Sequence, residues 1–329
     1  MSLQDVPEND PRHDGGRRQV RGQSVTRRTR RWLDGREFPF GIRFVDVGGH
    51  RLHYVDEGVG PTLLLVHAGP AWSFVYRDLI VRLRTQFRCV TLDFPGAGLS
   101  VAAAGYRPGM AAASQVLQAF VEALDLRDVT LVVHDVGGPV ALGVAVHLPD
   151  RFVALVVTEA FGWPLSDENP KVARILRLVG SPTFTVVNGA TNLLARVTAT
   201  RYGIGRHLTA EGRRTFLGPY RDSRVRRYAN AMLGDAAIDV DYLRALDNAV
   251  CTTLSDRPVL LVFGQESPTV KEGFPARWTA RFPDARLILL EGAHHFPMMD
   301  DPDRVSAVIR SWWVEVVAAG LRTRSWPSG

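Results

Sequence analysis

The sequence is poor in cysteine and lysine and has no long hydrophobic run, and each scarcity excludes a class of protein. Cys89 and Cys251 are too few for a disulfide framework and fit no metal-ligand spacing, so we expect no metal site and a reducing compartment, the cytoplasm. No apolar run reaches the roughly 20 residues of a membrane span, and no secretory signal is evident. Lys171 and Lys271 are the only lysines, so the net charge of +6 comes almost wholly from arginine.

Arginine is concentrated at the start of the sequence. Nine arginines fall within residues 1–36, a polar segment without apolar periodicity. Such composition cannot bury enough apolar surface to fold, so we expect residues 1–36 to form a disordered tail. A basic tail also suits contact with nucleic acid or a membrane surface. We prefer the solvated tail and expect no nucleic-acid partner.

The remaining residues predict one large α/β domain, since 329 residues with 46% hydrophobic content suffice for a single extensive core. Strand and helix patterns alternate, except over residues 165–249, which are helical and rich in arginine. Alternation of this kind indicates a doubly wound, mostly parallel sheet, here with an inserted helical cap at 165–249 between core segments 37–164 and 250–329. Strand patterns occupy 44–47, 52–56, 62–66, 88–93, 129–134, 151–158, 258–263 and 286–290, and helix patterns 73–84, 112–124, 139–145 and 302–317.

The most informative segment is residues 131–141, LVVHDVGGPVA. A buried strand leads through small residues into a helix, which is the layout of a nucleophile elbow with Asp135 at its tip. A carboxylate at that position favours attack on saturated carbon, because the product is an alkyl ester. The alternative is a strand that ends in an Asp helix cap. This segment by itself does not decide between the two.

Other residues complete a candidate site around Asp135. His295 lies in a loop between the last predicted strand and the last helix, where a base that activates water is expected. Glu159 and Glu266 each follow a predicted core strand, and either can orient His295. The backbone N–H groups of Gly69 and Val136 are candidates for an oxyanion hole, although Gly69-Pro70 also fits a plain turn. We interpret the Gly-rich segment 93–100 as structural.

With these residues in place, the sequence resembles the α/β-hydrolases over about residues 44–313, and within them the haloalkane dehalogenase-like group. Three segments carry the resemblance: HAGPAWSFVYR at 67–77, DFPGAGLS at 93–100 and VHDVGGPVAL at 133–142. The resemblance implies an α/β-hydrolase fold, Asp135 as nucleophile, His295 as base, and Gly69 and Val136 as the oxyanion hole. It implies no cofactor, and a small apolar substrate with water as the partners.

The chain departs from that group at three positions. Val136 replaces the Trp that usually donates a hydrogen bond to the leaving halide. Gly69 replaces an Asn that is commonly a second donor to the halide. Ser267 occupies the G-x-x-D position that supplies the acid in some members. We therefore expect Glu159 to be the acid that orients His295, and Glu266 is the alternative candidate. Trp163, or an aromatic or Asn residue of the cap, is the candidate substitute for the missing halide donors.

Two other functions stay open. Epoxide hydrolases share the Asp elbow and polarise the epoxide oxygen with cap tyrosines, for which Tyr202, Tyr220, Tyr228 and Tyr242 are candidates. A non-catalytic binding protein on the same scaffold is the third hypothesis, which the Asp135–His295 pair disfavours. The sequence leaves the substrate and the oligomeric state undetermined.

Overall fold

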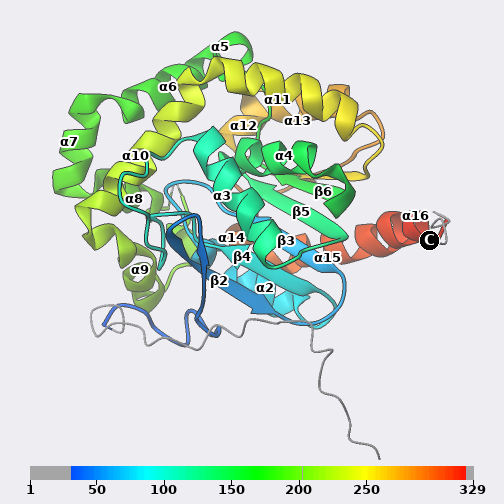
Figure 1. Cartoon of the computed structure of the whole chain (residues 1–329), viewed down its shortest axis with the longest axis horizontal. Helices are drawn as coiled ribbons and strands as arrows, with labels where there is room; N and C mark the ends of the chain where they lie inside the picture. The colour runs from blue at the N-terminus through cyan, green and yellow to red at the C-terminus, as the bar shows by residue number, and fades with distance from the viewer. Residues whose placement is uncertain (1–30, 202, 324–329) are drawn as a thin grey trace, which may run out of the picture.

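The structure, a computed structural model, describes residues 31–201 and 203–323, and its centre is a mostly parallel sheet with helices on both faces (Figure 1). Within the described residues the strand order is β1-β2-β4-β3-β5-β6-β7-β8. Strand β2 runs antiparallel to β1 and β4, and the other neighbouring strands are parallel. The predicted α/β-hydrolase sheet is confirmed. The strands are β1 (Arg43–Val47), β2 (His50–Glu57), β3 (Thr62–Val66), β4 (Arg88–Leu92), β5 (Val129–His134), β6 (Phe152–Thr158), β7 (Val259–Gly264) and β8 (Arg286–Leu290).

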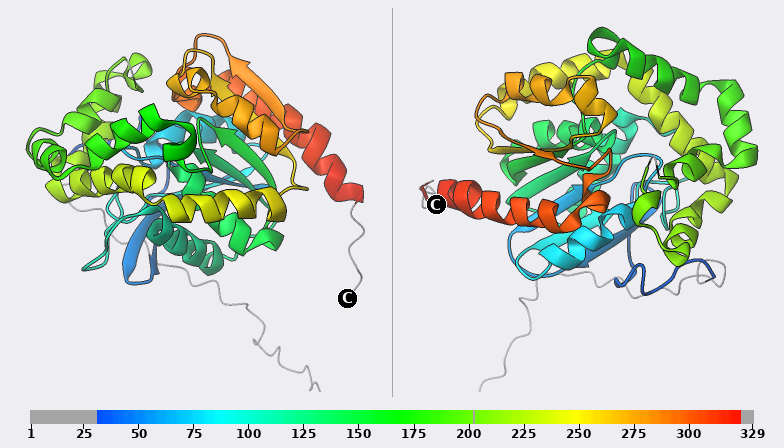
Figure 2. Two further views of the ribbon diagram at one scale, coloured as in Figure 1. Left: turned by 90° about the horizontal axis from the view of Figure 1, so that it is seen from above. Right: turned by 180° about the vertical axis from the view of Figure 1, so that it is seen from behind.

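Apolar residues along the central strands alternate between two hydrophobic cores. Leu131 and Val133 of β5 lie in the core shared with α3 (Met110–Ala123) and α4 (Gly137–His147), whereas Val132 lies in the core on the opposite face. That second core includes α2 (Arg77–Leu83) and α15 (Pro302–Trp312). Successive side chains of a strand point to opposite faces, so a strand buried on both faces must be apolar throughout. Figure 2 shows the helices on the two sides of the sheet.

The helical segment between β6 and β7 forms a layer of its own beside the sheet (Figures 1 and 2). Helix α10 packs against α6 and α7, and α11 packs against α4. The last helix ends at Thr253 rather than at the predicted boundary 249, because Leu246 and Val250 continue its buried face. The α-helices of this segment are α5 (Leu165–Glu168), α6 (Pro170–Gly180), α7 (Pro182–Thr191), α8 (Leu193–Thr198), α9 (Ala210–Leu217), α10 (Ser223–Ile238) and α11 (Val240–Thr253), joined by short 3-10 helices at Gly205–His207 and Pro219–Arg221.

Smaller elements carry the loops that surround the sheet. The predicted helix 73–84 is a 3-10 turn, Ser73–Tyr76, followed by α2. The final helix continues beyond residue 317 through a π-turn, Trp313–Val317, into α16 (Ala318–Thr323). No helix in the described ranges is both long and apolar enough to cross a membrane. The remaining elements are a 3-10 turn at Pro149–Arg151, α12 (Pro268–Lys271), α13 (Phe274–Arg281) and α14 (Pro297–Asp300).

Residues 31–36 contradict the prediction of a disordered tail that extends to residue 36. Trp32 is 7% exposed, and its ring meets that of Trp72 edge-on at 6.1 Å between centroids. The hydroxyl of Thr215 donates a 3.0 Å hydrogen bond to the carbonyl of Trp32. Burial of the indole side chain offsets part of the entropy cost of ordering these residues. The rest of the predicted tail, residues 1–30, lies outside the described residues.

Candidate active site

Asp135 stands at the turn between β5 and α4, where the backbone is held in a conformation that L-residues rarely adopt. Its φ is +48°, and its carboxylate side chain is 22% exposed. Two glycines follow it. A Cβ on Gly137 would lie 2.6 Å from the carbonyl oxygen of His67, so only glycine permits this approach of α4 to the end of β3. The structure therefore builds the strand–turn–helix elbow with a carboxylate at its tip.

The imidazole of His295 lies between two carboxylates. Its Nε2 is 3.7 Å from Asp135 Oδ2, and its Nδ1 is 3.7 Å from Glu159 Oε2. Burial acts to lower the pKa of His295, but hydrogen bonding and the charges of Asp135 and Glu159 outweigh burial and raise the pKa to about 10. The ring is therefore protonated while both carboxylates are ionised.

Glu159 is fully buried at the end of β6, also with a positive φ, of +54°. The backbone N–H of Gly264 donates to its Oε1 at 2.6 Å, and the Ser267 hydroxyl donates to Oε2 at 2.6 Å. The hydroxyl of Thr269 donates to Oε2 as well. These donors stabilise a carboxylate that has no access to water. The sequence analysis missed the roles of Ser267 and Thr269, although Ser267 at the G-x-x-D position was a usable signal.

The alternative acid, Glu266, is placed differently. Its side chain is exposed, and its backbone N–H donates to the carbonyl of Ala293. The structure therefore brings Glu159, not Glu266, to the His295 ring. The carboxyl ends of parallel strands meet at one edge of the sheet, which is why residues after β5, β6 and β8 gather around the same point.

His134, the residue before Asp135, is a neighbour that the sequence analysis did not single out. It is fully buried, and its ring centroid lies 5.0 Å from that of His295. Nδ1 donates to the carbonyl of Thr158 at 3.1 Å, and Nε2 has no hydrogen-bond partner within residues 31–201 and 203–323. Burial, followed by the charge of His295, holds the pKa of His134 well below its ordinary value. His134 is therefore a neutral ring packed against the charged one.

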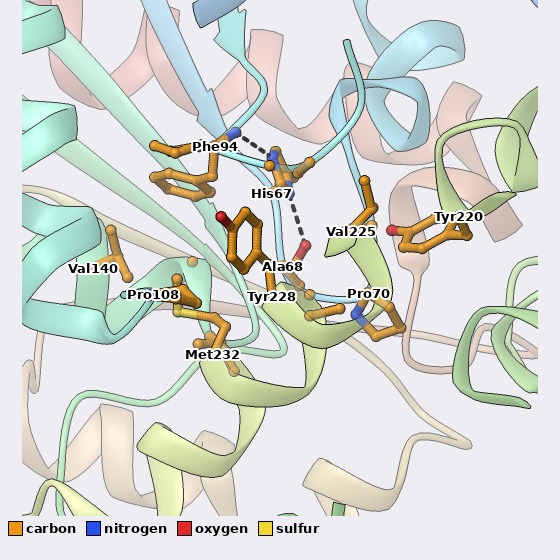
Figure 3. Close-up of a pocket in the computed structure, with 18 residues that line it drawn as sticks. His67, Ala68, Pro70, Phe94, Pro108, Val140, Tyr220, Val225, Tyr228 and Met232 are labelled. Atoms are coloured by element: carbon orange, nitrogen blue, oxygen red, sulfur yellow. Dashed lines mark hydrogen bonds between the residues drawn. The ribbon is translucent and has the colours of Figure 1, made fainter. Parts of the chain in front are cut away.

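A cavity opens beside the elbow, lined by the sheet edge on one side and by α10 on the other (Figure 3). Gly69, Val136 and Gly137 contribute to its wall, so both candidate oxyanion-hole residues lie at the cavity. Helix α10 contributes Val225, Tyr228, Ala229 and Met232, and the loops contribute His67, Ala68, Pro70, Ala71, Phe94, Pro95, Gly96, Ala97, Pro108 and Tyr220, with Val140 from α4. Most of these side chains are apolar, which favours an apolar ligand.

His67 and Asp93 form the rigid framework beneath this cavity. His67 Nδ1 donates to the carbonyl of Ala68 at 2.7 Å, and its Nε2 accepts from the N–H of Phe94 at 3.2 Å. The buried Asp93 carboxylate accepts from His53 Nδ1 and from the N–H groups of Ser73 and Leu99, each at 2.8 Å. The hydrogen bonds of segment 93–100 are structural, and the segment also contributes residues to the cavity wall.

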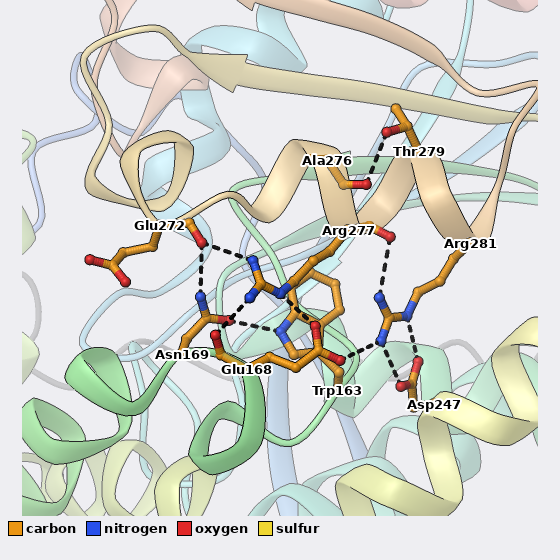
Figure 4. Close-up of polar contacts among 9 residues, drawn as sticks. All are labelled: Trp163, Glu168, Asn169, Asp247, Glu272, Ala276, Arg277, Thr279 and Arg281. Carbon is orange, nitrogen blue, oxygen red and sulfur yellow. Dashed lines mark hydrogen bonds and ion pairs between the residues drawn. The ribbon is translucent and has the colours of Figure 1, made fainter.

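The structure contradicts a role for Trp163 at the leaving group. Trp163 is fully buried, its Nε1 donates to Asn169 Oδ1 at 3.0 Å, and its ring packs against Trp278. Figure 4 shows it within a polar cluster that links the start of the helical segment to α13, where Arg277 and Arg281 bind Glu168. Its one donor is already used, and it does not line the cavity.

Of the four tyrosines considered from the sequence, Tyr220 and Tyr228 line the cavity. Tyr220 is 2% exposed, and its hydroxyl has no hydrogen-bond partner among the residues that the structure describes. Tyr242 is engaged elsewhere, since its hydroxyl donates to the carbonyl of Pro139 at 2.9 Å. Tyr202 lies outside the described residues. Tyr220 thus contributes a buried hydroxyl to the group of residues that line the cavity.

The described residues contain no cluster of three or more His, Cys, Asp or Glu side chains arranged to hold a metal ion. The polar groups at the elbow are therefore a carboxylate, an imidazole, a second carboxylate and backbone N–H groups. This set matches the parts that nucleophilic catalysis needs: a nucleophile, a base within reach and a group that orients the base.

Comparisons with known proteins identify the family and the fold of the chain. A family model described as alpha/beta hydrolase fold matches residues 61–302. Haloalkane dehalogenase 2 of Mycobacterium tuberculosis is 34% identical over 283 residues, which cover 84% of this chain and 96% of that protein. A cis-3-alkyl-4-alkyloxetan-2-one decarboxylase of Shewanella oneidensis is 27% identical over 288 residues, which cover 84% of this chain and 89% of the decarboxylase. The crystal structure of a loop variant of a haloalkane dehalogenase from Bradyrhizobium elkanii superposes with a TM-score of 0.73 at 20% identity, covering 87% of this chain and all of that one.

Proposed function

The chain belongs to the α/β-hydrolase fold family and, within it, to the haloalkane dehalogenase-like group, and from this premise we propose that Asp135 hydrolyses carbon–halogen bonds through a covalent ester. The enzyme is a hydrolase of the haloalkane dehalogenase-like type. The observation that carries the proposed site is the His295 ring, which lies 3.7 Å from the elbow carboxylate and 3.7 Å from the buried Glu159.

In the first step of the proposed reaction, an Asp135 oxygen attacks the saturated carbon. The carbon–halogen bond breaks, the halide leaves with the bonding electrons, and an alkyl ester forms on Asp135. The ester is neutral, so His295 loses one of its two neighbouring anions and its pKa falls. The imidazolium then releases its proton to solvent and becomes a neutral base.

In the second step, His295 takes a proton from water, and the hydroxide attacks the ester carbonyl of Asp135. The N–H groups of Gly69 and Val136 bind the oxyanion that forms. As this intermediate collapses, the His295 imidazolium gives its proton to the departing alkoxide, which leaves as the alcohol, and the Asp135 carboxyl group passes its proton to His295, which restores the carboxylate and the imidazolium. Glu159 holds the ring orientation and stabilises the imidazolium. The net reaction consumes water and yields an alcohol, a halide ion and a proton, with no cofactor.

We assign the helical segment that begins at residue 165 as a cap over this site, because α10 supplies one wall of the cavity. The apolar lining favours a small apolar substrate that lies between cap and core. Cys89 and Cys251 are free thiols, which suits the reducing cytoplasm proposed from the sequence.

Tyr220 supports a second candidate function, the hydrolysis of epoxides. Tyr220 lines the cavity, its buried hydroxyl has no partner in the described part of the chain, and a phenol there can donate a proton or hydrogen bond to a ring oxygen as the ring opens. Val136 and Gly69 offer no side-chain donor to a halide, so an oxygen leaving group is better served than chloride. The relative from Shewanella oneidensis is named for an oxetan-2-one, which is also a strained oxygen ring.

The deciding experiment is a substrate panel on the purified full chain, with the Asp135→Asn variant as the inactive control. Chloro-, bromo- and iodoalkanes, terminal epoxides and an alkyl oxetan-2-one are each supplied, and halide, diol and carbon dioxide are measured. Halide release that depends on Asp135 supports the dehalogenase proposal. Diol without halide identifies an epoxide hydrolase, and carbon dioxide from the oxetanone identifies a decarboxylase. Full turnover by Asp135→Asn contradicts all three.

A further inference from the structure

The outer face of helices α6, α7 and α8 carries an unusual density of exposed aliphatic side chains. In the described part of the chain, thirteen large hydrophobic residues are exposed, and six of them lie between residues 170 and 198. Two are more than 60% exposed on α6, and Val186 on α7 is 74% exposed. We call this surface the outer cap face; its aliphatic residues are Ile175, Leu178, Val186, Val187, Leu193 and Val197.

The charge of the same segment has one sign. Residues 169–210 contain no Asp or Glu, although the chain has 34 in 329 residues and a stretch of this length would hold about four at that frequency. The segment contains Lys171, Arg174, Arg177, Arg196, Arg201 and Arg206. Lys171 is paired with Glu272 and Arg206 with Asp300. Among the described residues, no carboxylate lies within ion-pair distance of the exposed side chains of Arg174, Arg177 or Arg196.

Cations and aliphatic side chains share one side of α6. Arg174, Ile175 and Leu178 follow the three- and four-residue spacing of a helix face and are all exposed, whereas Ala173 is buried on the opposite side. Helices α6 and α7 pack on α10, so their free sides point away from the protein. Figure 1 shows α6 and α7 along the outer edge of the molecule.

We propose that the outer cap face binds the surface of a bilayer that contains anionic phospholipid. An amphipathic surface of this type places aliphatic side chains at the boundary of the acyl chains and guanidinium groups among the phosphates. A second copy of the chain is a poorer occupant, because a two-fold interface would set the arginines of one copy against those of the other. A bilayer supplies the opposite charge and the apolar phase together.

Binding through the outer cap face would bring the cavity beside Asp135 close to the lipid phase. This binding does not depend on the reaction at Asp135. Helix α10 supports the outer cap face through α6 and α7, and it also lines the cavity. An apolar substrate that partitions into a bilayer would thus be concentrated near the cap. Binding is measured without any substrate, so its failure and the failure of the hydrolase proposal are separate results.

The test is flotation of the full-length protein with vesicles of phosphatidylcholine, with and without about 30 mol% phosphatidylglycerol. We expect roughly tenfold more protein to float with the anionic vesicles at low salt, and less as salt rises. The triple variant Arg174→Gln, Arg177→Gln, Arg196→Gln should lose most of this binding. The triple variant Ile175→Gln, Leu178→Gln, Val186→Gln should lose it as well, with its charge unchanged.

Matched variants elsewhere on the surface serve as controls. Arg43→Gln, Arg107→Gln, Arg304→Gln removes the same charge, and Val59→Gln, Leu287→Gln, Val314→Gln removes comparable exposed apolar groups. Both controls should bind like the unmodified chain. Binding that survives both outer-cap-face variants would assign it to another basic segment and overturn the proposal. Absence of vesicle binding, with a dimer that the aliphatic variant converts to a monomer, would also overturn it and identify a second copy as the occupant.

Discussion

The hydroxyl of Ser267 donates a 2.6 Å hydrogen bond to Glu159 Oε2, which joins the ends of two neighbouring strands, β6 and β7. Ser267 stands where some members of the family place the acid, and here it supports a carboxylate supplied by the other strand. Glu159 is fully buried and accepts a second bond from the N–H of Gly264. The carboxylate that lies beside His295 thus follows β6, and the hydroxyl that donates to it follows β7.

The first prediction concerns this acid. Glu159→Gln should lower turnover by about 10²- to 10⁴-fold, because the amide cannot stabilise the imidazolium or fix the ring tautomer in the same way. Glu266→Gln is the matched control and should retain activity, since its side chain is exposed. Steady-state kinetics on both variants measures the effect. A large loss in Glu266→Gln with little in Glu159→Gln would transfer the role to Glu266.

His295→Gln should trap the covalent intermediate. Alkylation of Asp135 needs no base, whereas hydrolysis of the ester does, so the ester accumulates when the base is absent. Intact mass spectrometry after incubation with a bromoalkane should show the added alkyl group, and peptide mapping should place it on Asp135. An unmodified protein in a variant that still releases one equivalent of halide would contradict the covalent mechanism.

The stability of the folded protein should fall between neutral and alkaline pH through His295. Its pKa is raised to about 10 in the folded state, against about 6.5 in an unfolded chain. A raised pKa contributes stability that is fully present below the unfolded value and is lost as pH approaches the folded value. The free energy of unfolding of the wild type, relative to His295→Gln, should decrease by up to about 1.4 kcal/mol per pH unit over this range. Urea titrations at several pH values measure it, and a constant difference would refute the prediction.

The Tyr220→Phe variant tests whether the Tyr220 hydroxyl has a catalytic role or a structural one. The hydroxyl is buried without a partner, so its removal should leave stability unchanged or raise it by about 1 kcal/mol. If the hydroxyl assists the leaving group, turnover should fall by about 10- to 100-fold, more for epoxides than for iodoalkanes. Tyr242→Phe, which loses a hydrogen bond to Pro139 outside the cavity, is the control for a general tyrosine effect. Equal turnover of Tyr220→Phe and wild type would exclude the role.

Halide binding should be weak in the unmodified protein, since Val136 and Gly69 provide only backbone N–H groups. Bromo- and iodoalkanes should react before chloroalkanes, because they leave with less assistance. The double variant Val136→Trp, Gly69→Asn should raise chloride affinity by about tenfold or more. A Cβ on Gly69 meets no atom closer than 4.0 Å, so a side chain can start there without a clash, whereas the Trp must displace neighbours of the buried Val136. Chloride quenching of tryptophan fluorescence reports the binding, and efficient turnover of chloroalkanes by the wild type would show that another donor is present.

Much of the fold and part of the site were predictable because they depend on local patterns. The bounds of β3 and β5 correspond to apolar runs between turn residues, and strands buried on two faces leave that signal directly in the sequence. The elbow is a local feature as well, because a strand pattern, two glycines and a helix pattern within about ten residues predict that Asp135 stands at the turn between strand and helix. The predicted end of the helical segment and the predicted disorder of residues 31–36 were wrong, because both features depend on contacts with residues distant in the sequence.

The sequence by itself determined which residue types are present and the order in which they meet the sheet edge: Asp135, Glu159 and His295. The tertiary structure decided which of them touch. It placed Glu159 rather than Glu266 beside His295, used the Trp163 donor on Asn169, and left the Tyr220 hydroxyl without a partner at the cavity. These outcomes depend on side-chain directions and on packing between segments some 100 residues apart, such as Glu159 with Ser267, and no local pattern encodes those distances.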